Sequence, residues 1–461
     1  MATAPTGETG ANNTPQWSSR FAFLMAAIGA AVGLGNLWRF PFMTGQYGGS
    51  AFVFVYLFCV VFVAYPIVVA ELAVGRHRGL SAVGSVAELA KDTGKSPSWG
   101  IAGWVGVIAG FLIVATYSVV AGQVIAYSLM SFFGEFAGRT GAEAAAATPL
   151  YNGPWAALLW HALFMGATIF IIAQNIQSGI ERVCTFLMPV FFVMLAGLCV
   201  YALVTGGAKE TITYLFSPRF SEINASVFLA ALGQAFFSIG VGEGILLTYG
   251  SFLPKDVNIG NNGALIAGAD TIVAVVAGLM IFPIVFSHGL DPAAGSGLIF
   301  GALPAVFAAM PGGSVIGGLF FFLAFIAALT SSISLLIGIT MVGVEQLKMS
   351  RPVSAMVFGA GAFLIGVIAI FLPTIAPWVD FASGSIMLPL GGLLIAVFAG
   401  WIAPRANMRE ELHNTGNFVF RFWRFFIRYA APIAVFVILV LGVDAKFNLG
   451  LNAFISGLAG S

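Results

Sequence analysis

Long apolar stretches dominate the chain and are separated mostly by short polar segments. A membrane-spanning helix needs about 20 apolar residues, and eleven stretches reach that length. They cover residues 20–42, 51–74, 100–133, 155–173, 184–204, 226–252, 262–287, 316–345, 353–373, 378–403 and 425–443. The pattern predicts an all-α membrane protein with eleven transmembrane helices. Residues 288–314, which hold Gly, Pro and apolar positions, are predicted to form short helices at the surface.

The composition excludes several functional classes. The 461 residues are 59% hydrophobic and 8% charged, whereas a soluble domain carries about 25% charged residues. A net charge of +1 gives no support to nucleic-acid binding. The three cysteines lie in apolar runs without disulfide or metal-site spacing. The four histidines are scattered in the sequence, and no nucleophile–base or metal-ligand pattern points to an enzyme.

The positions of lysine and arginine predict the orientation in the plasma (inner) membrane. With a cytoplasmic N-terminus, fourteen of these residues fall in inside loops and four fall in outside loops. Positive charge is enriched on the cytoplasmic side, so the C-terminus is expected outside. The polar segment before Trp17 does not resemble a cleaved signal peptide.

The first span contains residues that interrupt a helix. Gly33, Gly35 and Asn36 are followed by Arg39 and Pro41. Interior glycine weakens a helix and proline removes a backbone donor. Free carbonyls are tolerated at this depth only where protein or a cavity receives them. The segment is therefore predicted to break in mid-membrane and to offer its carbonyls to a cation.

The sixth span carries a second interruption. Gly240, Gly242 and Gly244 alternate through it, and Glu243 lies between the last two. Two interrupted spans in corresponding halves are typical of transporters built from inverted repeats. The alternative is that these glycines only allow close helix packing. Polar Asn36 and Glu243 at mid-span favour the binding interpretation.

Several motifs together resemble the neurotransmitter:sodium symporter family. They are Trp17, the run 29–41, Gly48 and Gly49, the run 71–76, the run 234–238 and the run 329–332. The resemblance implies one transporter domain over 1–461, with broken helices 1 and 6. It implies two inverted five-helix repeats, 20–204 and 226–403, followed by helix 11 at 425–443.

The resemblance implies two sodium sites. The first would use the Ala31 carbonyl, Asn36, Ser238, Asp270 and the substrate carboxylate. The second would use the carbonyls of Gly29, Val32 and Ala327 with the hydroxyls of Thr330 and Ser331. Taken alone, the hydroxyls at 330–332 would indicate helix packing, since Ser and Thr commonly bond to their own backbone.

Asp270 departs from the family pattern. Relatives often carry Asn there and balance the cations with chloride or a nearby acid, but this chain has Asp270 and Ala274. A carboxylate inside the membrane is expensive and indicates function. Beside sodium it would supply the missing negative charge, so chloride is not expected. After sodium leaves, the same carboxylate would take up a proton, which makes proton counter-transport a further expectation.

The implied substrate pocket lies between spans one, three, six and eight. Its matching residues are Ala31, Gly33, Gly35, Ile113, Tyr117, Phe237, Ser238, Gly240, Glu243, Ser331 and Leu335. Amine-selective relatives carry Asp where this chain has Gly33, so an amino acid with a free carboxylate is expected. Glu243 favours a substrate with a second cationic group; alternatively it stays protonated or bonds to neighbouring backbone.

The family closes its two sides with gates. The outer counterparts here are Tyr117, Phe237, Arg39 and Asp380, and the inner acid corresponds to Glu345. The usual inner arginine is replaced by Thr14, so Trp17 is expected to carry more of the closure. Gly179 and Pro189 resemble a motif at which span five unwinds to hydrate the second sodium.

The predicted function is sodium-coupled import of an amino acid by alternating access. The protein is expected to be a symporter surrounded by membrane lipid, and no sequence feature fixes its oligomeric state. The alternative is a membrane amino-acid sensor that binds without translocating. No signalling domain is visible in the sequence, which counts against the sensor.

Overall fold

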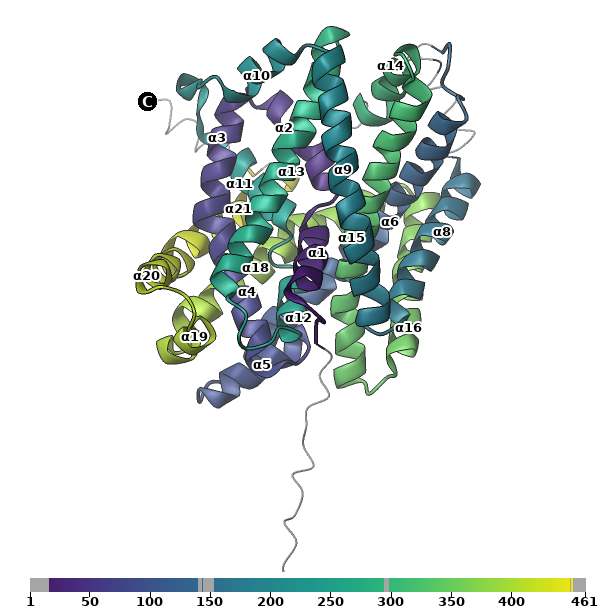
Figure 1. The fold of residues 1–461 in the computed structure, drawn as a ribbon. Helices are drawn as coiled ribbons and strands as arrows, with labels where there is room; N and C mark the ends of the chain where they lie inside the picture. The colour runs from purple at the N-terminus through teal and green to yellow at the C-terminus, as the bar shows by residue number, and fades with distance from the viewer. Residues whose placement is uncertain (1–15, 140–142, 144–152, 294–297, 448, 451–461) are drawn as a thin grey trace, which may run out of the picture.

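The computed structural model describes the chain except residues 1–15, 140–142, 144–152, 294–297, 448 and 451–461. Within the described residues every regular element is a helix and no strand occurs. The helices form one bundle, with α10 (Ala208–Phe216) and α14 (Leu303–Ala309) at one end (Figure 1). At the opposite end lie α5 (Ala82–Asp92) and α19 (Arg405–Glu411). Thr14 lies outside the described residues.

Nine continuous helical segments of the described chain are long and apolar enough to cross a membrane. The label η marks a π or 3-10 helix. Four of the nine segments are single helices: α8 (Pro154–Ala173), α13 (Ile259–Ser287), α15 (Gly313–Gln346) and α16 (Arg351–Phe371). The other five join consecutive elements: α3 (Ser50–Cys59) with η2 (Val60–Ala64) and α4 (Tyr65–Arg78); η3 (Pro97–Gly100) with α6 (Ile101–Phe132); η4 (Gln177–Glu181) with α9 (Arg182–Thr205); α17 (Ala376–Asp380) with η7 (Phe381–Met387), α18 (Leu388–Val397) and η8 (Phe398–Ile402); and α20 (Asn417–Phe425) with η9 (Phe426–Ala430) and α21 (Ala431–Phe447). The protein is therefore an all-α, multi-pass membrane protein.

A tenth candidate span is bent. It consists of α1 (Arg20–Ala31) followed by η1 (Gly35–Arg39) and α2 (Phe40–Gln46), with a bend of 51° at the break. Val32, at the end of α1, takes extended backbone angles and leaves the helix. Asn36 then accepts a 2.9 Å hydrogen bond from the Gly33 amide through Oδ1, so a side chain replaces the missing helical partner.

The predicted sixth span is divided into α11 (Ala225–Ile239) and α12 (Ile245–Ser251). Between them Gly240, Gly242 and Gly244 have φ angles of +68°, +89° and +72°, which side-chain-bearing residues rarely adopt. A Cβ at Gly242 would also lie 2.3 Å from the Leu388 carbonyl oxygen of α18. On the other side of this contact, a Cβ at Gly391 would lie 2.4 Å from the Gly242 oxygen. Glycine at this break thus serves both the turn and a close approach of two backbones.

The centre of the bundle is α15. Its most apolar 18-residue window is 89% buried, against 33% for α16. Helices α1 and α6 pack directly against it. A helix that is apolar on all sides belongs in the interior, so α15 is the central helix against which the bent first span packs. The short helices predicted within 288–314 correspond to η6 (Leu298–Ala302) and α14.

Candidate transport site

A small cavity lies where the two interrupted spans meet. It has a volume of about 50 Å³ and is lined by residues of α1, η1, α6, α11, α15 and the 240–244 segment. Its lining residues are Ala30, Ala31, Gly33, Leu34, Gly35, Ile113, Tyr117, Phe237, Ser238, Gly240, Glu243, Ser331 and Leu335. All eleven residues predicted for the pocket are thus brought together. Sequence reasoning missed Ala30 and Leu34, although their place in the interrupted segment was a signal.

Backbone groups of the first break face this cavity. The Leu34 amide donates a 3.1 Å hydrogen bond to the Tyr117 hydroxyl of α6. A Cβ at Gly33 would lie 2.9 Å from the Ser331 hydroxyl and 3.2 Å from the Tyr117 hydroxyl. Any side chain at Gly33 would therefore occupy the space between Tyr117 and Ser331. With glycine there, no side chain fills the space beside the backbone of the break.

Three of the residues predicted for the first sodium site form one buried group. The Asn36 side-chain nitrogen donates to Asp270 Oδ1 at 2.6 Å and to the Ser238 hydroxyl at 3.1 Å. Ser238 in turn donates to Asp270 Oδ2 at 2.8 Å. All three are nearly or fully buried. The Ala31 carbonyl belongs to the same break, at the last residue of α1.

Tyr56 of α3 is a fourth member of this group that sequence reasoning did not identify. Its hydroxyl donates to Asp270 Oδ2 at 3.4 Å. Across the described residues, Asp270 makes no ion pair with a lysine, arginine or histidine. A buried carboxylate without a cationic partner is costly. Hard oxygen donors of this kind suit an alkali cation.

The residues predicted for the second sodium site connect α1 to α15. The Ser331 hydroxyl donates to the carbonyls of Val32 at 3.0 Å and Gly29 at 3.3 Å. The Thr330 hydroxyl bonds to the Ala327 carbonyl at 3.1 Å within its own helix. The Thr330 contact is the helix-internal kind that packing alone explains, whereas the Ser331 contacts cross between helices. All five predicted residues therefore lie in one cluster.

Two buried glutamates flank the break in the sixth span. Glu71 of α4 accepts a 2.8 Å hydrogen bond from the Gly242 amide through Oε1, and its Oε2 has no partner among the described residues. Glu243 is 6% exposed and lines the cavity. Within the described chain no hydrogen bond ties the Glu243 carboxylate to neighbouring backbone. Glu71 therefore holds the turn, and Glu243 presents its carboxylate to the cavity.

A larger cavity of about 720 Å³ adjoins the small one, and residues of both predicted outer-gate pairs line it. Arg39 lies 4.6 Å from the centre of the Phe237 ring and donates to Gln234 Oε1 at 2.8 Å. Asp380 instead accepts a 2.8 Å hydrogen bond from the Thr116 hydroxyl. The Arg39 and Asp380 counterparts thus line one cavity without forming an ion pair, because each has another partner.

Trp17, the residue predicted to carry the inner closure, is packed among aromatic side chains. Its side chain is 5% exposed and packs edge-on against Tyr249 and Phe252, with ring centres 5.2 and 6.0 Å apart. Its indole nitrogen donates to the Tyr249 carbonyl at 3.3 Å. Edge-on aromatic pairs of this kind stabilise the packing of Trp17 against the end of α12.

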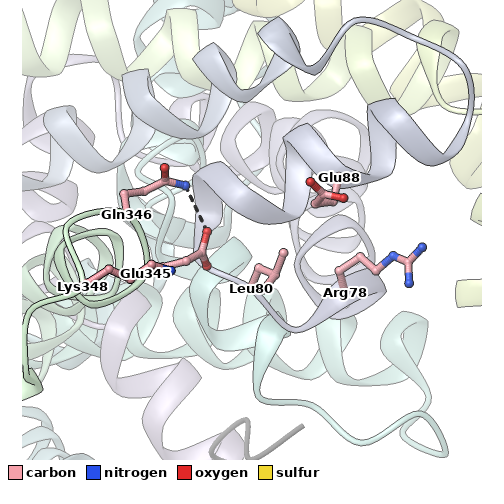
Figure 2. Close-up of a pocket in the computed structure, with 6 residues that line it drawn as sticks. All are labelled: Arg78, Leu80, Glu88, Glu345, Gln346 and Lys348. Atoms are coloured by element: carbon pink, nitrogen blue, oxygen red, sulfur yellow. Dashed lines mark hydrogen bonds between the residues drawn. The ribbon is translucent and has the colours of Figure 1, made fainter. Parts of the chain in front are cut away.

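Glu345, the predicted inner-gate acid, is engaged elsewhere. It accepts hydrogen bonds from the Ser81 amide at the start of α5 and from Gln346 at 3.1 Å (Figure 2). It lines a surface cavity of about 590 Å³ together with Arg78, Leu80, Glu88, Gln346 and Lys348. Among the described residues it has no ion-pair partner.

A cluster of charges at the same end joins α4 to α19. Glu411 pairs with Arg76 at 3.0 Å and with Lys255 at 2.6 Å, and His77 lies 3.2 Å from it. Burial raises the pKa of Glu411, but hydrogen bonds from His77, Lys255 and Arg76 outweigh burial and bring it to about 2. The ionised carboxylate therefore fixes the end of α4 to the segment that follows α12.

The chain matches a family model described as the sodium:neurotransmitter symporter family over residues 14–147 and 153–456. It is 33% identical over 441 residues to the sodium-dependent transporter YhdH of Bacillus subtilis (strain 168), a match that covers 92% of this chain and 96% of the relative. A sodium-dependent transporter of Haemophilus influenzae is also 33% identical, over 444 residues, covering 92% of this chain and 97% of the relative.

Among solved structures, the crystal structure of MhsT in complex with L-phenylalanine is similar, with a TM-score of 0.84 and 39% sequence identity. The match covers 92% of this chain and 99% of MhsT. Together with the family model, these similarities confirm the resemblance noted in the sequence. The chain belongs to the sodium:neurotransmitter symporter family, whose members are transporters and not enzymes.

Proposed function

We propose that this protein is a sodium-coupled secondary active symporter that imports an amino acid by alternating access. The observation that carries the proposal is the cavity between the two helix breaks, beside the buried group of Asn36, Ser238 and Asp270. Discontinuous helices that meet at mid-membrane are the usual way in which transporters bind ions and substrates. The proposal includes eleven spans, with α11 and α12 as the sixth, arranged as inverted repeats over 20–204 and 226–403.

An amino acid is the proposed substrate because the cavity suits a carboxylate. Gly33 leaves space beside the Tyr117 and Ser331 hydroxyls, and the Leu34 amide lies at the same place. A substrate carboxylate could accept hydrogen bonds from these donors, which an amine without a carboxylate could not. The L-phenylalanine in complex with MhsT supports the same class of substrate.

Two sodium ions are proposed to provide the driving force. Asn36, Ser238, Asp270 and the Ala31 carbonyl would hold the first, and the group around Thr330 and Ser331 would hold the second. A 100 mV potential and a tenfold gradient acting on two ions supply about 7 kcal/mol. That free energy concentrates a neutral substrate roughly 10⁵-fold.

Transport is proposed to be independent of chloride. Asp270 supplies a fixed negative charge within the first ion site, and Ser238, Asn36 and Tyr56 all donate to it. Donors directed at the carboxylate stabilise its charged form, so a second anion is not required. When sodium leaves, the carboxylate would take up a proton, which makes proton counter-transport part of the proposal.

Glu243 is proposed to select substrates that carry a second positive group, such as lysine, arginine or ornithine. Its carboxylate faces the cavity without a partner from neighbouring backbone in the described chain. A cation beside this buried carboxylate would stabilise its charged form. A cationic substrate would also gain from the membrane potential.

Uptake into proteoliposomes tests the proposal and separates it from the sensor alternative. The purified protein is reconstituted, and a panel of labelled amino acids is offered with an inward sodium gradient. A symporter accumulates its substrate above the outside concentration and loses accumulation when potassium replaces sodium. A sensor would bind the same amino acid without any accumulation, and that result would overturn the proposal.

A further inference from the structure

The segment just before α1 is fastened to the start of the fifth span. The Ser18 amide donates a 3.0 Å hydrogen bond to Glu181 Oε2, and the Ser18 hydroxyl donates to Oε1 of the same carboxylate. Glu181 is the last residue of η4 and is 8% exposed. Gln177, the first residue of η4, donates to the Gln16 carbonyl at 3.3 Å. Both carboxylate oxygens of the nearly buried Glu181 thus accept hydrogen bonds from Ser18.

This contact is not an ordinary helix cap. The Ser19 hydroxyl already accepts a 3.1 Å hydrogen bond from the Ala22 amide at the start of α1. Glu181 contributes from 163 positions further along the chain. Its bonds therefore fix where the N-terminal segment lies, because the start of α1 is already capped by Ser19.

The segment held in this way carries the inner closure. Trp17, next to Ser18, donates through its amide to the Phe252 carbonyl at 3.4 Å and through its indole to Tyr249. Residues 16–18 therefore bridge the end of α12 on one side and η4 on the other. Glu345 takes no part in this bridge, since it bonds to Ser81 and Gln346.

The fifth span also contacts the other end of α1. The Gly29 carbonyl is one of those proposed for the second sodium site. A Cβ added at Gly29 would lie 3.1 Å from the Met188 sulfur of α9, so the two residues are in close contact. Between these two contacts, α9 and η4 follow α1 along its length. Movement of the fifth span would therefore act on the sodium-site end of α1 and on its gate end together.

We infer that Glu181 is an inner-gate residue whose carboxylate holds Ser18, and with it Trp17, in the closed position in place of an arginine–acid pair. Release of these two hydrogen bonds frees Trp17 from Tyr249 and opens the inner side. The inference rests on the proposed alternating access and adds to it the contact that closes one side. Glu181 acts through Ser18 and Trp17 and touches neither substrate nor ion.

A native cysteine can report the opening. Cys184 of α9 is fully buried and lies three residues after Glu181, and α9 packs against α1. In a background with C59A and C199A, Cys184 is the single thiol of the chain. Its reaction rate with a membrane-impermeant maleimide, applied from the face that carries the N-terminus, measures how often this side opens. A C184A variant gives the background signal.

Glu181→Ala is expected to raise the Cys184 labelling rate about tenfold or more, because hydrogen bonds to a charged acceptor are stronger than neutral ones. Ser18→Ala, which keeps the amide bond, is expected to raise the rate by a smaller factor. The double variant should label no faster than Glu181→Ala, since both changes remove the same contact. Glu88→Gln removes an exposed acid at the same end and is expected to match the parent.

An unchanged rate in Glu181→Ala, or effects of Ser18→Ala and Glu181→Ala that multiply independently, would overturn the inference. Ser18→Ala removes only a hydroxyl at an exposed position, so its result holds even if Glu181→Ala folds poorly. Labelling needs no transport. If the parent accumulates substrate while labelling does not respond, the gate inference alone fails; if the parent does not accumulate substrate, the proposed function fails instead.

Discussion

The hydroxyl of Ser238 lies 2.8 Å from a carboxylate oxygen of Asp270 and donates a hydrogen bond to it. This bond connects α11, just before the break in the sixth span, to the middle of α13. Asn36 of the first break donates to the same carboxylate. One buried acid therefore joins both interrupted spans, which makes its charge the natural point to test.

Replacing Asp270 with Asn removes this charge and keeps the size of the side chain. The concentration of sodium for half-maximal uptake is expected to rise about tenfold or more, since a lost charge–charge contact of about 1.4 kcal/mol corresponds to that factor. Uptake is measured against sodium concentration, with chloride or gluconate as the anion. The parent should be indifferent to the anion, and a parent that stops working in gluconate would contradict the role given to Asp270.

Glu243→Gln tests the substrate class at constant side-chain size. Competition by lysine, arginine and ornithine is expected to weaken about tenfold, which corresponds to one lost charged contact of about 1.4 kcal/mol. Competition by neutral amino acids should change little. The measurement is inhibition of sodium-dependent uptake by each of the twenty amino acids and ornithine. The same order of inhibitors in parent and variant would remove Glu243 from selectivity.

Gly242→Ala is expected to abolish uptake and to lower the yield of folded protein. Its φ of +89° strains any side chain, and the new Cβ would meet the Leu388 carbonyl oxygen at 2.3 Å. Such backbone strain alone costs of order 1–3 kcal/mol. Gly233→Ala is the matched control, because Gly233 lies within α11 and nothing lies within 4 Å of its Cβ position. A helical alanine there should be neutral or stabilising by roughly 0.5–1 kcal/mol, as measured by thermal unfolding in detergent.

The Glu411 cluster predicts a loss of stability in acid. The folded-state pKa of Glu411 is lowered to about 2 from 4.5, so its contribution is present above the unfolded pKa and is lost as the pH falls from about 4.5 toward 2. Glu411→Gln should lower stability near neutral pH by about 3 kcal/mol, the lower end for breaking a buried ion pair. It should also flatten the fall in melting temperature between about pH 5 and pH 3.

The control for that experiment is Glu88→Gln, because the Glu88 side chain is 41% exposed and its carboxylate makes only a 3.6 Å ion pair with Lys91. Its melting temperature is expected to follow the parent at each pH. If Glu411→Gln retained the full acid dependence of the parent, the destabilisation would come from other carboxylates.

The sequence predicted those parts of the molecule that depend on local backbone chemistry. Gly33 and Gly35 near Asn36, and the glycines at 240–244, are sufficient to predict where the two spans break. The motifs around these glycines contain most of the residues that line the cavity, because neighbouring residues of each broken segment lie beside the cavity. What the sequence could not give are contacts set by side-chain conformation between distant elements. Examples are Arg39 bonding to Gln234 and not to Asp380, Tyr56 at Asp270, and Glu181 at Ser18.

The contact between the sixth-span break and α18 has a consequence for motion. Gly242 meets Leu388 and Gly391 through backbone atoms, with glycine on both sides. Interlocked side chains resist sliding, because each must change rotamer before its neighbour can pass. The backbone contact at Gly242 lacks that resistance, so we expect the broken span to shift against α18 with fewer rotamer changes than side-chain packing there would require.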